Sequence, residues 1–432
     1  MNRVLVAAGL AGVLIAAVVP GVAASASGQP FADVTYSSPT VVGMSRGEPR
    51  MAVAPDGTLY VAASQPLGRD SVFTSADDGD TWSALPGTNI PFGGGDDDVM
   101  VSSDGTVWLA GQEPGSLCES VASSVGGGAA FVPQPIACGV LGSADRPWLA
   151  ASDRGPQGLR VFLYFNLNGT HTITASDDGG LTWSTVGTLP GGHFPGYLVV
   201  DGTAGFVYAV TTIRTGGHDA SLVVYRSADE GATWTPYPVA PMTTGDRGLS
   251  HVYLAADDAG NLYTAWADDP DGSGMRVWFA RSTDHAATWS PPVLVSSAAG
   301  THVFPAIDAG TPGRVAVAWY ETPTTGDPNT LDDAAQWHVE GATSIDGGVH
   351  WTTAAVSSVN HTGALCTKGG SCSGHRLLLD FLSVVVDGDG AAHVVWSDDT
   401  APGIDLLVGP VVTSTARSTA VEGIGARPFD TD

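Results

Sequence analysis

The sequence predicts an all-β fold, a single β-propeller of seven blades, with six blades as the alternative. Three observations predict it: a recurring octet of the form S-x-D-x-G-x-T-W, a recurring strand–turn–strand segment between the octets, and matching strand sequences at the two ends. A repeat of about 40–50 residues is the size of one four-stranded propeller blade. The repeats therefore indicate one closed ring rather than several separate domains.

The octet has a clear structural purpose. Three full copies, two variants and one decayed copy run over residues 75–82 (SADDGDTW), 176–183 (SDDGGLTW), 227–234 (SADEGATW), 282–289 (STDHAATW), 344–351 (SIDGGVHW) and 124–131 (SVGGGAAF). Its Asp can accept hydrogen bonds from turn amides, its Gly supplies a positive φ, and its Trp can pack beneath the hairpin. We therefore expect the octet aspartates to fasten turns and not to catalyse.

The second repeated element predicts the inner hairpin of each blade. Its copies begin at Pro49, Asp98, Pro147, Gly196, Val252, Pro305 and Leu382. Each copy is an apolar strand, a turn rich in Asp and Gly, and another apolar strand, and alternating strands of this kind form antiparallel sheets. Together with the strands that flank each octet, the copies give four strands per blade.

The chain ends predict how the ring closes. The segment from Thr35 (TYSSPTVV) matches the outermost strand that begins at Thr288 (TWSPPVLV), whereas the last repeat holds only three strands and ends near the segment from Asp405 (DLLVGPVV). We therefore expect the N-terminal strand to pair with the last blade, which closes the sheet and protects its edges. The predicted propeller domain covers residues 31–415, and residues 416–432 form a C-terminal tail.

The N-terminus predicts export. Arg3 precedes an apolar run from Val4 to Val19, and Ala24-Ser25-Ala26 offers a signal-peptidase site, so residues 1–26 are expected to be a cleaved signal peptide. An uncleaved anchor is the alternative, although the run is short for a span of about 20 residues. The protein is thus expected to be secreted and extracellular.

The four cysteines fall into two local pairs. An exported chain meets an oxidising compartment, so Cys118 is expected to bond to Cys138, and Cys366 to Cys372. Neither pair has the spacing of a metal site.

The charge balance limits the partners. The chain carries 44 acidic and 17 basic residues, a formal net charge of −27. Nucleic acid and anionic membranes are therefore poor partners, and membrane insertion is not expected. Solubility of an exported protein is the favoured explanation of this acidity, and a surface evolved for a ligand is the alternative. We expect a monomer.

The octets and hairpins in this order resemble the sialidase (neuraminidase) superfamily, whose members carry bacterial neuraminidase repeats, also called Asp-boxes. The resemblance covers nearly the whole mature chain. The same octet occurs in xyloglucan-cleaving hydrolases and in non-enzymatic propellers such as sorting receptors and photosystem assembly factors. The resemblance implies a secreted glycan-active propeller, with a sialidase-like glycoside hydrolase as the first hypothesis. A non-catalytic propeller that binds a glycan or a protein is the alternative.

The candidate site is expected in the central funnel, on the face opposite the octets. Arg50, Arg146 and Arg376 occupy matching places in three repeats, and a cluster of Arg forks can hold a carboxylate. The alternative is that each Arg pairs with a neighbouring carboxylate and holds a loop. The long loop from Thr322 to Trp337 is expected to lean over this site.

The resemblance also implies catalytic roles. In sialidases a three-Arg clamp holds the sugar acid, a Tyr activated by a Glu attacks the sugar, and an Asp transfers protons. Tyr320 is therefore the candidate nucleophile, and Asp98 or Glu321 the candidate for proton transfer. Adjacent strand residues point to opposite faces, so Tyr320 and Glu321 can meet one sugar only where the strand has ended.

No cofactor is expected. The segment from Ala267 (ADDPDGSG) has the composition of a calcium loop, which leaves a structural Ca²⁺ ion as the alternative, but it lacks the distant bidentate Glu of such loops.

Overall fold

The computed structural model is all-β and almost free of helix. The two short 3-10 helices are η1 (Gly155–Gln157) and η2 (Pro328–Thr330). The structure describes residues 34–45, 47–65, 69–85, 96–113, 118–125, 131–132, 134–138, 144–192, 195–243, 251–369, 372, 378–400 and 409–418. The expected signal peptide lies outside the described residues. Among the described residues, none forms a helix with the length and apolar character that a membrane span requires.

The structure shows six antiparallel blades, the alternative, rather than the seven predicted first; each is built from four strands that follow one another in the sequence. The first three are β3 (Arg50–Val53), β4 (Leu59–Gln65), β5 (Arg69–Ser75) and β6 (Ser83–Ala84); β7 (Asp98–Val101), β8 (Val107–Gln112), β9 (Cys118–Ser124) and β10 (Gln134–Cys138); and β11 (Ala144–Asp153), β12 (Leu159–Leu167), β13 (Thr170–Ser176) and β14 (Ser184–Leu189).

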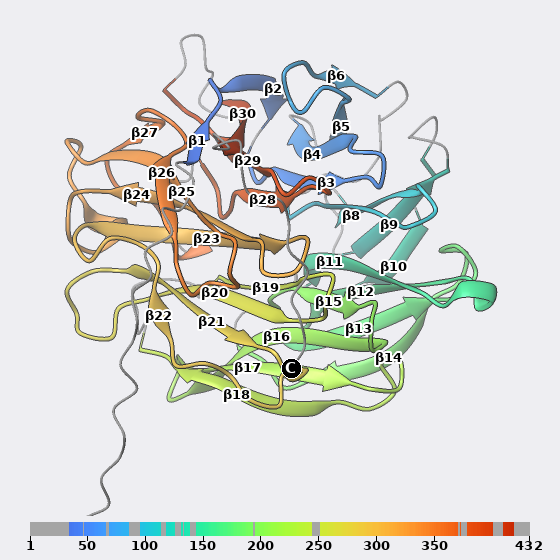
Figure 1. The fold of residues 1–432 in the computed structure, drawn as a ribbon. Coiled ribbons are helices and arrows are strands. Elements are labelled where there is room, and N and C mark those ends of the chain that lie inside the picture. Colours follow the sequence, from blue (N-terminus) through green and yellow to red (C-terminus); the bar gives the residue numbers. More distant parts are fainter. Residues whose placement is uncertain are drawn as a thin grey trace, which may run out of the picture.

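The next three blades continue this order. They are β15 (Leu198–Asp201), β16 (Phe206–Thr215), β17 (His218–Ser227) and β18 (Thr235–Pro241); β19 (Val252–Ala256), β20 (Leu262–Asp268), β21 (Arg276–Ser282) and β22 (Val293–Leu294); and β23 (Thr301–Ala309), β24 (Val315–Thr322), β25 (Gln336–Ser344) and β26 (Thr352–Ala355), with β27 (His361–Thr362) beside β25. Figure 1 shows the sheets arranged around a common centre, with first strands such as β3, β11, β19 and β23 innermost.

The remaining sheet draws on both ends of the described chain. It contains β28 (Ser383–Val386), β29 (Ala392–Ser397) and β30 (Gly409–Ser418), and both β1 (Val34–Tyr36) and β2 (Thr40–Ser45) pair with β30. β30 extends to Ser418, so the domain boundary predicted at 415 falls inside a strand.

The octets form the hydrogen bonds that their sequence predicts. In the first octet the amide of Thr81 donates to Asp77 Oδ1 (2.9 Å), and Trp82 Nε1 donates to Gly79 O (3.1 Å). Equivalent amide bonds reach Asp178, Asp229 and Asp284. The hydrogen bonds from Thr182 lower the pKa of Asp178 to about 2. These carboxylates are therefore committed to their own turns.

The core lies between neighbouring blades, and its largest fully buried side chains include Trp266, Trp319, Trp337 and Trp396. Both predicted disulfides are confirmed, Cys118–Cys138 and Cys366–Cys372. Cys118 and Cys138 lie opposite each other on β9 and β10.

Two arginines that directly precede octets join one blade to the next. Arg226 Nη1 donates to His285 O (2.6 Å), and Arg281 Nη1 donates to Asp346 O (3.2 Å) and Gly347 O (3.0 Å). In each case the acceptor is a backbone carbonyl in the octet of the following blade. In the sequence, these contacts are marked by an Arg directly before the octet Ser in two repeats.

Replacing Arg281 with Ala is expected to lower the free energy of unfolding by about 1–2 kcal/mol, because two charge-assisted hydrogen bonds between blades are lost. Chemical denaturation measures the change. Arg214→Ala is the matched control, since the Arg214 side chain is 39% exposed and donates to Gly217 O within its own hairpin. Equal losses in the two variants would contradict the inter-blade role.

Candidate functional site

Charged side chains gather where the first strands begin, on the face opposite the octets. We call this group the central cluster; it comprises Glu48, Arg50, Asp96, Asp97, Asp98, Asp145, Arg146 and Asp380. Although it is charged, most of it is buried: Arg50 is 7% exposed, Asp98 3% and Arg146 3%.

Arg50 has its charge satisfied inside this cluster. Its Nε lies 3.2 Å from Asp98 Oδ1, and the amide of Leu149 donates to Asp98 Oδ2 (2.8 Å). The guanidinium also lies over the rings of Tyr197 (4.5 Å) and Trp148 (5.4 Å), at cation–π distance. Arg50 therefore contacts the first residue of β7 and the rings of Tyr197 and Trp148.

Arg146 joins three further segments. Its Nη2 lies 3.0 Å from Asp380 Oδ2 and its Nε 3.6 Å from Asp96 Oδ1. The amide of Asp96 in turn donates to Glu48 Oε2 (3.1 Å). Arg50 and Arg146 thus pair with carboxylates and hold loops, as the alternative interpretation of the sequence expected. Arg376 lies outside the described residues.

Arg50 and Arg146 do not occupy matching places, so the sequence interpretation needs correction here. Glu48, Asp96, Arg146, Phe304 and Leu379 all have φ between 54° and 58°. Glu48, Asp96, Arg146 and Phe304 each stand two residues before the first strand or its regular part, and Leu379 stands four residues before β28. The β11–β12 and β23–β24 registers shift next to Arg146 and Phe304. Arg146 therefore corresponds to Glu48, whereas Arg50 corresponds to Trp148.

The carboxyl groups outnumber the guanidinium groups at this centre. Burial, followed by the charges of Asp96 and Asp380, raises the pKa of Glu48 well above its usual range. Burial also raises the pKa of Asp98, in spite of Arg50. Fully buried Glu119 on β9 has its pKa raised well above the usual range by burial and by Asp145. Glu119 was missed from the sequence, which gave no signal for it.

Tyr320 and Glu321 do not come together at a site. Tyr320 is fully buried in the core, its hydroxyl accepts a hydrogen bond from the amide of Ser397 (3.2 Å), and burial raises its pKa above the usual value. Glu321 accepts from Trp319 Nε1 (3.0 Å) and lies 3.2 Å from His302 Nε2. The nucleophile role expected for Tyr320 is therefore not supported, because its hydroxyl faces β29 inside the core.

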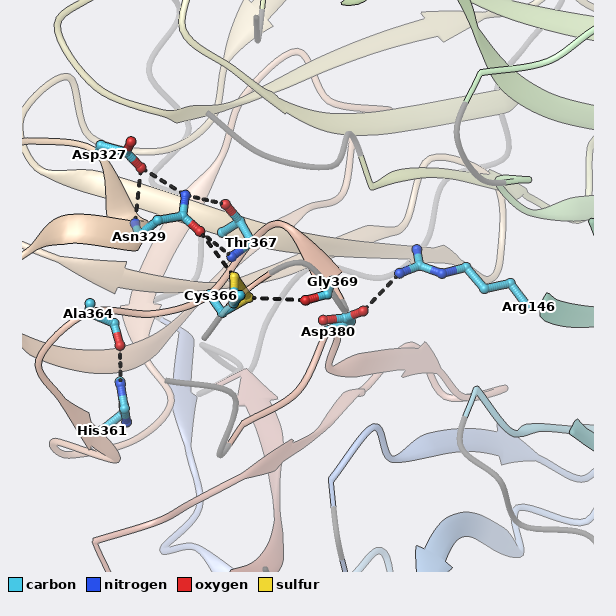
Figure 2. The surroundings of a disulfide bond; sticks show 10 residues. Arg146, Asp327, Asn329, His361, Ala364, Cys366, Thr367, Gly369 and Asp380 are labelled. Carbon is cyan, nitrogen blue, oxygen red and sulfur yellow. Dashed lines mark hydrogen bonds and ion pairs between the residues drawn. A yellow bond between two sulfur atoms is a disulfide. The ribbon is translucent and has the colours of Figure 1, made fainter. Parts of the chain in front are cut away.

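The loop between Thr322 and Trp337 packs against the disulfide segment. Asn329 Nδ2 donates to Thr367 Oγ1 (2.9 Å), and the amide of Thr367 donates to Asn329 Oδ1 (2.9 Å). Figure 2 shows these bonds beside Cys366, together with the Arg146–Asp380 pair. The loop is thus held by the segment that follows β27.

The calcium-like segment uses its carboxylates internally. Asp268 accepts from the amide of Thr243 (3.0 Å), Asp269 from the amide of Gly274 (3.0 Å), and Asp271 from Ser273. Over the described part of the chain, no group of three His, Cys, Asp or Glu side chains could hold a metal ion.

A cavity of about 810 Å³ opens on the octet face, among turns that join first and second strands. We call it the octet-side cavity. Its lining is Val53, Ala54, Pro55, Asp56, Gly57, Thr58, Ala76, Asp78, Val101, Ser103, Asp258, Ala309, Gly310, Thr311, Val386, Asp387, Gly388 and Asp389. The sequence did not predict it, because its walls are short turns from five sheets that are distant in the chain.

Buried His361 connects β27 to the last blade. Its Nδ1 lies 2.6 Å from Asp399 Oδ2, and its Nε2 lies 3.0 Å from Ala364 O. A carbonyl and a carboxylate both accept hydrogen bonds, so this geometry favours the protonated imidazolium over the neutral ring. Burial alone would lower the pKa of His361, but the hydrogen bond to Asp399 outweighs it and the pKa is raised.

We expect the melting temperature to fall as the pH rises from about 5 to 8. Stability from His361 is fully present below the unfolded pKa of about 6.5 and is lost as the pH rises through the raised folded pKa. The raised pKa of Glu48 acts in the same direction, since the folded state holds a proton that the unfolded chain releases. The octet aspartates have lowered pKa values, so they change the stability only below about pH 4. Calorimetry on His361→Gln should show a shallower slope, and an unchanged slope would contradict the assignment.

Comparison with known proteins finds relatives that match part of this chain. No family model matches the chain. It is 32% identical over 218 residues to a xyloglucanase from Paenibacillus sp, covering 46% of this chain and 20% of the relative. It is 27% identical over 248 residues to a xyloglucanase from Hypocrea jecorina (strain QM6a), covering 51% and 29%. The chain thus spans less than a third of the length of these relatives.

A solved structure agrees with the architecture. The GH74 enzyme from Niastella koreensis superimposes with a TM-score of 0.52 at 17% identity, over 85% of this chain and 55% of that one. At this identity the similarity establishes the fold alone. The expected resemblance to sialidase-like β-propellers is confirmed at that level.

Proposed function

We propose that this protein is a glycan-active propeller that binds a neutral polysaccharide of the xyloglucan kind. The observation that carries the proposal is the pairing of Arg50 with Asp98 and of Arg146 with Asp96 and Asp380. Both arginines pair with protein carboxylates and are more than nine-tenths buried, which disfavours their use to hold the acid group of a sialic acid. The similarity to two xyloglucanases supports the same substrate class.

Electrostatics favours a neutral sugar as well. The chain has a net charge of −27, and the central carboxyl groups already exceed the guanidinium groups beside them. An anionic ligand would add like charge to a buried, low-dielectric region, which disfavours its binding. A neutral glycan meets no such penalty, because its hydroxyls donate to carboxylates.

Hydrolysis is the second candidate, favoured by the activity named for the relatives. Glycoside hydrolysis ordinarily needs two carboxyl groups, one of them with a raised pKa that donates a proton. Asp98 has such a pKa, and Glu321 is the other proton-transfer candidate. Asp98 is only 3% exposed, which favours binding without cleavage as the primary function.

One assay separates these functions. The purified mature protein is incubated with xyloglucan and with 3′-sialyllactose, and both affinity and newly released reducing ends are measured. We expect binding to xyloglucan and none to sialyllactose. Preferential binding or cleavage of sialyllactose would overturn the neutral-glycan proposal, and release of reducing ends from xyloglucan would establish hydrolysis.

We further propose that the protein is exported, with cleavage after Ala26, and that it acts outside the cell as a monomer. The two disulfides support export, since such bonds persist in oxidising compartments. Amino-terminal sequencing of the secreted protein tests the cleavage, and a terminus other than Ser27 would contradict it.

We propose that the sheet of β28, β29 and β30, together with the N-terminal strands, closes the ring. The support is that β1 and β2 both pair with β30, whereas the six blades are each continuous in sequence. Closure of this kind leaves fewer free strand edges than an open row of sheets.

A further inference from the structure

We infer that the glycan binds in the octet-side cavity, and not at the central cluster on the opposite face. This inference rests on the proposed function, because it assigns a place to the same ligand. The octet-side cavity has a volume of about 810 Å³, within the range of about 300–1,000 Å³ that is usual for ligand sites.

The pocket that the described residues form at the central cluster is too small for a sugar. A pocket there, lined by Arg146, Trp148, Tyr197, His251 and Tyr253 among others, has a volume of about 10 Å³. That volume is about enough for one water molecule. Since Arg50, Asp98 and Arg146 are also at least nine-tenths buried, a sugar ring would have to displace the packed blades to reach them.

The cavity wall, in contrast, is made of exposed turns that connect first and second strands. These include the β3–β4 turn around Gly57, the β23–β24 turn around Gly310 and the β28–β29 turn around Gly388. Turns on a rigid ring place groups precisely without burying them. An added Cβ at Gly57 or Gly388 would meet no atom within 4 Å, so the space beside these turns is open.

The lining chemistry suits a neutral chain of hydroxyl groups. Its polar side chains are carboxylates such as Asp56, Asp258 and Asp389 and hydroxyls such as Thr58 and Thr311, and it includes no Lys or Arg. Hydrogen bonds from Thr58 lower the pKa of Asp56, so this group is ionised at neutral pH. Ionised carboxylates accept hydrogen bonds from sugar hydroxyls and repel uronic and sialic acids.

The apolar part of the lining can contact sugar C–H faces. Val53, Pro55, Val101 and Val386 contribute it. The arrangement of a few polar groups over a partly apolar floor is typical of small-molecule sites. The ligand class assigned to this cavity is therefore a neutral oligosaccharide.

Two matched glycine substitutions test the inference. Gly388 and Gly202 both lie in turns between first and second strands, and an added Cβ at either would meet nothing within 4 Å. Only Gly388 belongs to the cavity lining. Gly388→Trp fills the cavity, whereas Gly202→Trp adds the same side chain to a turn outside it.

Isothermal titration with oligosaccharides released from xyloglucan provides the measurement. We expect the unaltered protein and Gly202→Trp to bind equally, Gly388→Trp to bind at least about tenfold more weakly, and all three to melt at similar temperatures. Thr311→Trp, on a different turn of the same cavity, should weaken binding likewise and covers the case in which Gly388→Trp is unstable.

The outcomes separate the two proposals. Unchanged affinity in Gly388→Trp and Thr311→Trp would overturn the cavity assignment and leave the proposed glycan function standing. Failure of the unaltered protein to bind any neutral oligosaccharide would overturn both. Equal binding of an oligogalacturonide would overturn the selection against anionic sugars.

Discussion

Replacing Arg146 with Ala is expected to lower the free energy of unfolding by about 3–5 kcal/mol. The side chain is 3% exposed and pairs with Asp380 and Asp96, so its removal leaves buried carboxylates without their counter-charge. Burial raises the pKa values of the neighbouring Glu48 and Asp145, and the charge of Arg146 opposes this rise. Without Arg146 these two carboxyls hold protons more readily, so the loss should be smaller at pH 5 than at pH 8. Chemical denaturation at the two pH values measures both effects.

Arg160→Ala is the matched control for this prediction. Arg160 also faces two carboxylates, Asp177 (3.3 Å) and Glu230 (3.5 Å), but their side chains are 52% and 41% exposed. Solvent screens such pairs, so the control should lose less than about 1 kcal/mol. A loss in Arg146→Ala no larger than in Arg160→Ala would contradict the account of a buried ionic centre.

Deleting residues 27–45 is expected to lower the stability by more than about 5 kcal/mol, a large share of what an ordinary domain possesses. The deletion removes β1 and β2, both of which pair with β30, and it exposes the edge of that strand. It also removes Val42, which is 6% exposed, from the core. Thermal unfolding and gel filtration measure the result.

Deletion of residues 419–432 serves as the control, since it leaves every described strand intact. We expect its melting temperature to match that of the full mature chain. If removal of residues 27–45 were equally harmless, the N-terminal strands would not close the ring.

The sequence predicted the repeated parts of the fold because each is a local pattern. The octet around Asp77 and the hairpin from Pro49 both have fixed spacing and turn chemistry, and the structure has them where the pattern does. The disulfide between Cys118 and Cys138 was predicted because an exported chain is expected to meet an oxidising compartment and because the two residues are close in the chain.

The site was less predictable because it depends on backbone offsets and on burial. The positive φ at Arg146 (58°) places Arg146 at the position of Glu48 and not of Arg50, which residue types alone do not reveal. Tyr320 was suggested by its neighbour Glu321, but it faces the core. The octet-side cavity is made by turns of distant blades, so no local motif marks it.

A crystal structure of the mature protein with a xyloglucan oligosaccharide tests the central claim most directly. The account predicts sugar density in the octet-side cavity, between the turns that carry Gly57 and Gly388. Density on the opposite face, in contact with Arg50 and Arg146, would contradict it.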